Sequence, residues 1–230
     1  MDRMEQRGQY PQSRYHLSRL AEQQVLIRNQ VPLIAMLAHL EGDSTDFAQL
    51  NRLVTGRLVN ATLTERSAQR LMNLRTAVAF MTSSPQGFDL LTFGHINDLV
   101  TEGIGLNGGE LRVGPVMVGD QDFGIPVPQA AAVQHDLVTL RLKHPDYTDR
   151  ALQALAYILA HQLYRDGNSA TAFLVANHVL MSRGAGVLLL LPDQFAEYQW
   201  SVANFYRKHD TEGFCKWLYH NALYGPEDLA

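Results

Sequence analysis

Apolar residues recur at helical spacing along almost the whole chain, and only one long segment departs from this pattern. Apolar side chains three and four residues apart share one face of a helix, so the spacing predicts an all-α core. The exceptional segment is GIGLNGGELRVGPVMVGDQDFGIPVP, residues 103–128, which is rich in glycine and proline. Within it apolar residues alternate on both sides of Gly119-Asp120, which predicts a short exposed β-hairpin.

The expected helices follow from the apolar spacing and from the residues that interrupt it. They span residues 17–29, 31–40, 47–57, 64–81, 93–102, 129–143, 149–163, 169–183, 192–208 and 211–223. Pro32 is expected to restart the second helix, and Thr64 and Thr92 are expected to cap the fourth and the fifth. The sequence contains no internal repeat and no convincing linker. We therefore predict one all-α domain with a single surface hairpin, preceded by a flexible polar tail at residues 1–16.

The composition excludes several classes of protein. The chain has 230 residues, of which 46% are hydrophobic, and this is enough for one buried core. A net charge of −4 and scattered basic residues argue against a nucleic-acid partner. The apolar run at residues 187–191 is far shorter than the ~20 residues of a membrane-spanning helix. A single cysteine, Cys215, excludes an internal disulfide and fits a reducing compartment.

The N-terminal residues are polar and lack the apolar centre of a secretory signal peptide. Together with the composition, this predicts a soluble protein without nucleic-acid or membrane partners. We expect it to be cytoplasmic, or exported without a cleaved signal peptide. The sequence is also compatible with a homo-oligomer.

The stretch LYRDGNSATAFLVAN, residues 163–177, resembles a phosphate-binding loop that runs into a helix. Gly167 and Asn168 tolerate the backbone conformations of a tight anion nest. The free N–H groups and the dipole of the following helix favour an anion at the same place. Asp166 beside the nest is suited to hold a Mg²⁺ that bridges phosphate oxygens. The alternative is a plain helix–turn–helix with an Asn or Ser cap, which spacing alone favours.

Two other patterns carry little weight. Gly103, Gly105 and Gly108 match the letters of the dinucleotide fingerprint, but a helix precedes them and a strand follows, whereas the fingerprint requires the reverse. The nine histidines show no standard metal-ligand spacing, and Cys215 stands alone. We interpret the glycines as a flexible turn and the histidines as surface or partly buried residues.

HQLYRDGNSATAFLVANHVLMSRGAG, residues 161–186, resembles the signature segment of Fic-family (Fic/Doc, or Fido) proteins. Their motif runs His-Pro-Phe-x-Asp/Glu-Gly-Asn-Gly/Lys-Arg and continues into a helix. Three more segments resemble parts of this family in the same order. Residues 40–43 resemble an N-terminal inhibitory helix, RVGPVMVGDQDFGIPVP (112–128) resembles the flap hairpin, and residues 192–223 resemble the closing helices.

The resemblance implies the all-α Fic fold, a helical bundle with one β-hairpin flap. It places an N-terminal helical region with the inhibitory-like segment at residues 17–90 and the Fic core domain at 91–230. It also implies transfer of AMP from ATP to a hydroxyl of another protein, with Mg²⁺ as the metal. The flap would bind the target chain as an extra strand through Val116, Met117 and Val118.

Two essential parts of the family motif are replaced in this chain. The position of the histidine base is Gln162, whose amide does not take up a proton at physiological pH, and losing such a base removes about 10²–10⁴-fold in rate. His161 is one residue away, which is about 100° of rotation on a helix. The position of the arginine clamp is Ala170. The motif acid is retained as Asp166. The expected nucleotide- or phosphate-binding residues are Gly167, Asn168, Ser169, Ala170 and Thr171.

Glu41-Gly42 resembles the inhibitory segment of one Fic class. There the glutamate pairs with the motif arginine and excludes the outer phosphate of ATP. In this chain the arginine is absent and Leu37 replaces the Ser or Thr four residues earlier, so the resemblance leaves Glu41 without a group to restrain. The alternative, of equal weight, is that Glu41-Gly42 simply ends a helix.

The sequence therefore predicts a degenerate Fic-domain protein that lacks ordinary AMP-transferase activity and acts as a nucleotide- or partner-binding pseudoenzyme. Mg²⁺ and ATP or another nucleotide are the expected ligands of its cleft, and a protein bound to the flap is the expected partner. The alternative is a divergent transferase of AMP or another phosphate-containing group, in which His161, Tyr164, Arg165 or Ser169 replaces the lost groups. A third interpretation is a structural protein with a vestigial cleft, which occlusion by Glu41 or by bulky side chains would favour.

Overall fold

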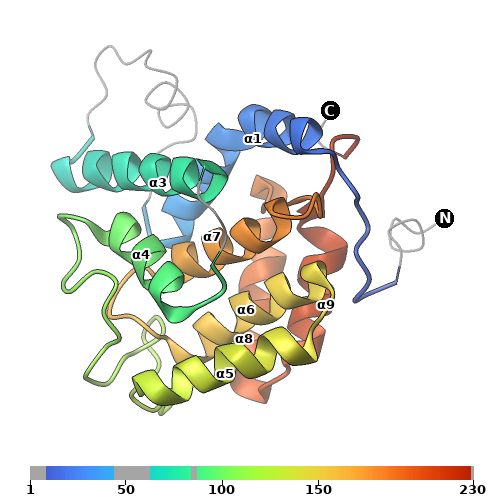
Figure 1. Cartoon of the computed structure of the whole chain (residues 1–230). Coiled ribbons are helices and arrows are strands. Elements are labelled where there is room, and N and C mark those ends of the chain that lie inside the picture. Colours follow the sequence, from blue (N-terminus) through green and yellow to red (C-terminus); the bar gives the residue numbers. More distant parts are fainter. Residues whose placement is uncertain (1–8, 44–62, 84–86, 229–230) are drawn as a thin grey trace.

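A computed structural model describes residues 9–43, 63–83 and 87–228, and the regular secondary structure in these ranges is almost entirely helical (Figure 1). The helices are α1 (Arg19–Leu40), α3 (Glu65–Ser83), α4 (Leu90–Thr101), α5 (Ala130–Lys143), α6 (Tyr147–His161), α7 (Asn168–Met181), the short 3-10 helix η2 (Pro192–Gln194), α8 (Phe195–Lys208) and α9 (Thr211–Asn221). The predicted all-α class is confirmed, and the helix expected at 47–57 lies outside the described residues. None of the described helices is long and apolar enough to cross a membrane.

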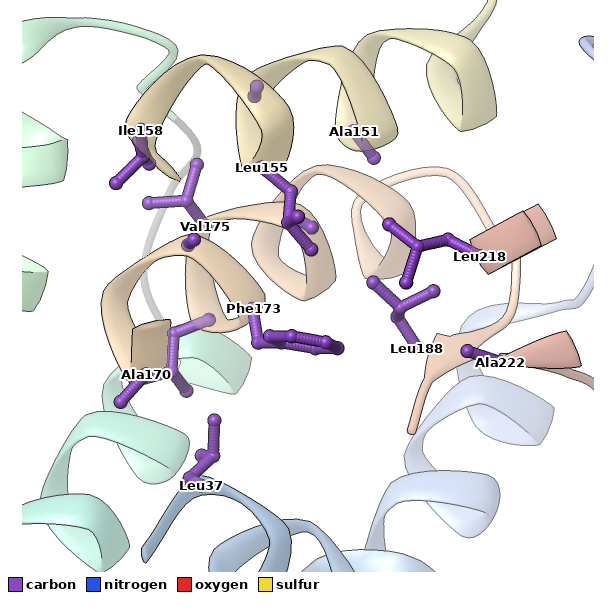
Figure 2. Close-up of a cluster of buried hydrophobic side chains, with 14 of the residues drawn as sticks. Leu37, Ala151, Leu155, Ile158, Ala170, Phe173, Val175, Leu188, Leu218 and Ala222 are labelled. Atoms are coloured by element: carbon purple, nitrogen blue, oxygen red, sulfur yellow. The ribbon is translucent and has the colours of Figure 1, made fainter. Parts of the chain in front are cut away.

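Helix α7 lies at the centre of the fold, packed against α6, α4, α3 and α1 (Figure 1). All of its residues except Ser169 and Met181 are buried, which is expected of a helix that is apolar on every side. Figure 2 shows part of this core, in which Ala170, Phe173 and Val175 of α7 lie among side chains of α6, α1 and the C-terminal region. The N-terminus of α7, where the anion nest is expected, is therefore held by the centre of the core.

Helix α1 is continuous from Arg19 to Leu40, with Pro32 inside it, although the sequence predicts a break there. Proline inside a helix removes one hydrogen bond and costs about 3 kcal/mol. The residues that follow, from Leu33 to Ala38, are all buried in the core. Burial of one large apolar side chain contributes about 1.5–3 kcal/mol, so several of them outweigh the proline.

The caps of two helices show where the local sequence signals succeed and fail. Thr64 precedes α3 as predicted, and its hydroxyl accepts a hydrogen bond from the N–H of Ser67 at 3.1 Å. Helix α4 begins at Leu90 rather than after Thr92, because the Asp89 carboxylate accepts from the N–H of Thr92 at 2.8 Å. Aspartate caps at least as well as threonine, and the prediction of Thr92 as the cap is wrong.

A small antiparallel sheet that the sequence analysis did not predict joins the end of the chain to α7. Strand β1 (Val187–Leu188) pairs with β2 (Leu223–Tyr224), so the last predicted helix ends at Asn221 instead of residue 223. The backbone of Leu188 makes two hydrogen bonds with the side chain of Asn177 on α7, at 2.7 and 2.9 Å. Strands of two residues are too short for alternation to reveal them.

The glycine- and proline-rich segment forms the predicted hairpin, reduced to its tip. Val118 and Gln121 form an antiparallel bridge around Gly119-Asp120. We call residues 113–126 the flap.

Residues 10–17, part of the stretch expected to be a flexible tail, pack against α6 and α9. The Tyr10 hydroxyl donates to the carboxylate of Asp149 at 2.9 Å. The Arg14 guanidinium donates to the carbonyl of Tyr219 at 2.7 Å and lies over the Tyr219 ring. This stretch therefore connects α6 and α9 on the surface of the bundle.

Candidate functional site

The loop between α6 and α7 is closed by Asn168. Its side-chain amide accepts from the N–H of Tyr164 at 2.9 Å and donates to the carbonyl of Tyr164 at 2.7 Å. Gln162 and Gly167 take left-handed conformations at the two ends of the loop, with φ of 43° and 73°. A Cβ on Gly167 would lie 2.8 Å from the Cγ2 of Thr101, so both the conformation and the packing require glycine.

Asn97 on α4 holds this loop through hydrogen bonds of its side-chain amide. Its amide nitrogen donates to the carbonyl of Asp166 at 2.9 Å and to the hydroxyl of Thr171 at 3.0 Å. Its amide oxygen accepts from the N–H of Gly109 at 3.0 Å, near the start of the flap segment. The sequence analysis missed Asn97, although a polar residue on the buried face of a predicted helix is a usable signal. Thr171, predicted to bind phosphate, is instead fully buried against Asn97.

The carboxylate of Glu41 occupies the position expected for a phosphate at the N-terminus of α7. Its Oε1 accepts from the N–H of Ala170 at 2.8 Å. Burial raises the pKa of the Glu41 carboxyl, while the Ala170 N–H and the charge of Arg70 oppose this rise and Asp166 adds to it. The end of α7 therefore donates a hydrogen bond to an acceptor that the chain itself supplies.

Glu41 makes a backbone contact within α1 and a side-chain contact with α7. Glu41 ends α1 through its backbone, because its N–H donates to the carbonyls of Leu37 and Ala38 at 3.2 Å, and Gly42 follows with φ of 75°. Its side chain meanwhile reaches α7. The expectation that Glu41 has nothing to restrain is wrong, because the backbone N–H of Ala170 takes the place of an arginine partner.

Gln162, at the position of the family base, is fixed by two acceptors. Its amide nitrogen donates to the Tyr206 hydroxyl at 2.8 Å and to the carbonyl of Leu159 at 3.1 Å. The Tyr206 hydroxyl in turn donates to Leu159 at 2.9 Å, and burial raises the pKa of Tyr206, so this hydroxyl stays protonated. This network orients the side chain of Gln162. It contains no basic group that could accept a proton from a substrate hydroxyl.

Two of the candidate replacement groups face away from the cleft. The Nδ1 of His161 lies 2.9 Å from the carbonyl of Tyr157, and the two rings are 4.1 Å apart. This orientation agrees with the rotation expected for the residue next to Gln162. Tyr164 is fully buried, and its hydroxyl has no partner among the described residues.

The side chain of Ala170 points into the core rather than into the cleft. Ala170 is fully buried, and Figure 2 shows it in the buried cluster that also contains Leu37 of α1. A longer side chain in this position would displace core residues. The structure therefore offers no room for an arginine clamp here, and only the backbone N–H of Ala170 is available to an anion.

Among the described residues one arginine is buried, and this residue, which the sequence analysis did not select, ties the flap to the bundle. Arg112 is 5% exposed and has no acidic partner among the described residues. Its guanidinium donates to the carbonyls of Gly114 at 2.5 Å, Gln162 at 2.6 Å, Pro126 at 2.6 Å, Ile125 at 3.2 Å and His161 at 3.3 Å. Both ends of the flap are thus fixed to the C-terminus of α6.

These elements enclose one cleft of about 360 Å³. The sequence-predicted residues that line it are Glu41, Val116, Met117, Val118, Gln162, Asp166, Gly167, Asn168 and Ser169. His39, Arg165 and aromatic residues of α8 also line it. Gly42, Ala170 and Thr171 do not contribute to it. On the other side of the flap, Arg165 and Asp166 also line a second hollow of about 550 Å³.

Asp166 is exposed, and its carboxylate makes no hydrogen bond to the described residues. It is therefore free to bind a cation, but the described residues contain no group of three or more His, Cys, Asp or Glu side chains that could hold a metal alone. Asp166 fits a Mg²⁺ whose other ligands are phosphate oxygens and water.

Solved structures with the same arrangement are Fic proteins, although no protein-family model and no curated protein matches the sequence. A Fic-domain-containing signaling protein from Bacteroides thetaiotaomicron aligns with a TM-score of 0.71 and 13% identity over 88% of this chain and 87% of its own. Fic-1 from C. elegans aligns with a TM-score of 0.68 and 19% identity, over 88% and 63%. A Fic family protein from Desulfovibrio desulfuricans aligns with a TM-score of 0.64 and 18% identity, over 87% and 65%.

The chain spans less than two thirds of the latter two proteins. Identities below one fifth establish the fold and leave the activity to be argued from the site. The chain therefore has the Fic fold, an all-α bundle with one β-hairpin flap, as the resemblance in its sequence predicts.

Proposed function

We propose that this chain is a Fic-fold pseudoenzyme that binds a phosphate-containing ligand, such as a nucleotide with Mg²⁺, in the cleft and a partner chain along the flap. The observation that carries the proposal is the hydrogen bonding of Gln162, which stands at the position of the family base. Its side-chain amide donates to the Tyr206 hydroxyl and to the Leu159 carbonyl. Ordinary AMP transfer needs a proton acceptor there and a clamp at Ala170, and neither residue supplies it.

Binding of a phosphate is supported by the contact between Glu41 and the N-terminus of α7. The N–H of Ala170 already holds a carboxylate, and a phosphate oxygen is an equivalent acceptor. A ligand that uses this N–H must displace Glu41. A hydrogen bond to a charged group contributes about 1.5–3 kcal/mol, so Glu41 lowers the affinity for such a ligand by about tenfold or more.

Calorimetric titration with ATP, ADP and AMP, with and without Mg²⁺, tests the cleft. We expect Mg²⁺-dependent binding that Asp166→Ala abolishes and Glu41→Ala strengthens about tenfold. Glu41→Gln separates charge from shape, since glutamine keeps the acceptor oxygen. Absence of binding to the wild type and also to Glu41→Ala would contradict the nucleotide part of the proposal.

Partner binding is supported by the exposed apolar side chains of the flap. Val113 is 92% exposed and Met117 is 58% exposed, and the described flap residues form only one bridge. Backbone groups without partners in such a segment are suited to pairing with an extended chain. Capture of a partner from a cell extract should be lost with Val116→Pro, which removes a backbone donor, and kept with Val127→Pro just outside the flap. Equal capture by both variants would contradict a role of the flap.

A divergent transferase is the second candidate, favoured by two side chains at the cleft. His39 is exposed and lies against the ring of Phe195 at 4.4 Å, and Arg165 lies next to Asp166. Such an enzyme would use His39 as the proton acceptor and Arg165 as the phosphate partner. Mass spectrometry of candidate target proteins incubated with several nucleotides would detect the added group. Modification that persists in the double variant His39→Ala, Arg165→Ala would contradict these roles.

A further inference from the structure

A further pocket, of about 190 Å³, lies at the other end of α7. Its lining includes Phe88, Arg141, Tyr147, Arg150, His178 and Arg183. We call it the arginine pocket. A helix rises about 1.5 Å per residue, so His178 is about 15 Å along α7 from Asn168, and the arginine pocket is separate from the cleft.

The arginine pocket carries positive charge without an acidic partner. None of its three arginines forms an ion pair within the described part of the chain. The guanidinium carbons of Arg150 and Arg183 lie 4.9 and 4.6 Å from the centre of the Tyr147 ring. The two carbons are therefore at most 9.5 Å apart, the sum of these distances.

One of these arginines is held in place, and two keep their donors available. Arg150 donates to the carbonyls of His144 at 3.0 Å and Arg141 at 3.2 Å, which fixes its guanidinium at the end of α5. The side chains of Arg141 and Arg183 are exposed and make no hydrogen bond to the described residues. A ligand that enters the pocket therefore contacts the oriented guanidinium of Arg150. The exposed side chains of Arg141 and Arg183 can move to bind it as well.

The most informative group in the arginine pocket is His178, which is 1% exposed. Its Nδ1 lies 3.4 Å from the carbonyl of Met81, so this nitrogen is assigned the proton. Its Nε2 is then an acceptor, and it is buried without a partner in the described structure. Burial lowers the pKa of His178 against the opposing charge of Asp89, which keeps the ring neutral. A buried polar atom without a partner is unfavourable, and a ligand that donates a hydrogen bond would satisfy it.

We propose that the arginine pocket binds a small phosphate monoester. The phosphorus of a bidentate phosphate lies about 4 Å from a guanidinium carbon, so one phosphate can bridge two guanidinium groups about 8 Å apart. The volume is below the ~300–1,000 Å³ typical of pockets for drug-sized ligands, which favours a phosphate with a small substituent over a whole nucleotide. A carboxylate or sulfate would satisfy the arginines but has no proton for His178.

Titration of the full chain with methyl phosphate tests this site. The experiment is run at low salt and at pH 6, where a large share of a phosphate monoester carries a proton because its second pKa is about 6. Methyl sulfate has the same shape without a proton. We expect methyl phosphate to bind at least about tenfold more tightly than methyl sulfate, and the imidazole nitrogen signals of His178 to shift with methyl phosphate in an NMR spectrum.

The double variant Arg141→Gln, Arg183→Gln should bind methyl phosphate at least about tenfold more weakly. Both side chains are exposed, so the variant is expected to fold. Arg207→Gln, at an exposed arginine on α8, is the matched control and should bind like the wild type. Asp166→Ala should also leave this binding unchanged, which separates the arginine pocket from the cleft. No binding by the wild type, equal binding of the two ligands, or an equal loss in Arg207→Gln would overturn the proposal.

Discussion

At the scale of single residues, Gly167 and Gly42 share a backbone conformation, but only Gly167 is enclosed by other atoms. Their φ angles are 73° and 75°. A Cβ on Gly42 would meet nothing within 4 Å, whereas a Cβ on Gly167 would lie 2.8 Å from Thr101 and 3.0 Å from Val100. The two positions therefore form a matched pair that separates the effect of conformation from the effect of packing.

We expect Gly42→Ala to lower the free energy of unfolding by about 1–2 kcal/mol, the usual penalty of a left-handed conformation for alanine. Gly167→Ala adds a clash at the end of α4, so its loss should be larger, about 2–4 kcal/mol. Urea denaturation of both variants measures the difference. An equal decrease in the free energy of unfolding for both variants would show that the contacts around Gly167 do not restrict the side chain.

Glu22 is the residue whose protonation should make stability depend on pH. Its carboxylate is buried at the end of the bundle and accepts from the N–H of Gly184 at 2.7 Å. Burial raises the pKa of Glu22 from about 4.5 to about 7, against the effect of that hydrogen bond. Between these two values the folded chain keeps a proton that the unfolded chain has lost. Stability from this group is therefore present at low pH and declines as the pH rises toward 7.

Glu22→Gln keeps an acceptor for Gly184 and removes the titration. We expect the free energy of unfolding of the wild type to fall relative to Glu22→Gln by about 1–2 kcal/mol between pH 5 and pH 8. Urea denaturation of both proteins at several pH values measures this difference. A difference that stays constant over this range would contradict a raised pKa of Glu22.

At the scale of elements, Arg112 is the residue on which the flap depends. Five carbonyls from the flap and from the end of α6 accept its hydrogen bonds, and burial lowers the pKa of its guanidinium. Arg112→Ala leaves these acceptors without donors. We expect cleavage of residues 113–126 by a low concentration of protease to become at least tenfold faster, an effect of about 1.4 kcal/mol on local opening. Val113→Ala, at a position 92% exposed, should cleave like the wild type. Equal rates in all three proteins would show that other contacts hold the flap.

Elements were predictable where a local signal decides them. The helical spacing of apolar residues and the glycine- and proline-rich break between 103 and 128 indicated the bundle and its hairpin. Two errors arose where contacts outside the local sequence decide the outcome, because the core overrides Pro32 in α1 and Asn177 helps to form the two-residue strand β1. The third error was local, because the stronger cap Asp89 takes the place of Thr92 three residues later.

At the scale of the whole molecule, the candidate site was predictable only in part, because its parts come from distant segments. The nest residues Gly167 and Asn168 are contiguous and stand out in the sequence. Glu41 and Ala170 are 129 residues apart, and no local pattern indicates that one binds the backbone of the other. Asn97 and Arg112 act through backbone groups of other segments, which a sequence does not reveal. The same reason hid the arginine pocket, whose lining comes from α5, α6 and α7 and from the segments before α4 and after α7.

The packed N-terminal stretch offers the last test at this scale. Residues 10–17 lie across α6 and α9, and Arg14 donates to carbonyls near the C-terminal strand. Deletion of residues 1–16 removes these contacts and exposes Tyr219, which Tyr10 covers edge-on at 5.6 Å. Loss of the half-buried Tyr10 and of several hydrogen bonds should cost about 3 kcal/mol, and for a chain of this size 1 kcal/mol shifts the melting temperature by about 2–4 °C.

We therefore expect the deletion of residues 1–16 to lower the melting temperature by about 6–12 °C in calorimetry. Deletion of residues 1–8 is the control, because it leaves every described contact of residues 10–17 in place. If both deletions leave the melting temperature unchanged, this stretch behaves as the flexible tail that its polar sequence predicts. A lower melting temperature only after the longer deletion would mean that this polar segment stabilises the bundle through hydrogen bonds to α6, α9 and β2. Such bonds need no helical spacing of apolar residues, which explains why the sequence of the segment gives no sign of order.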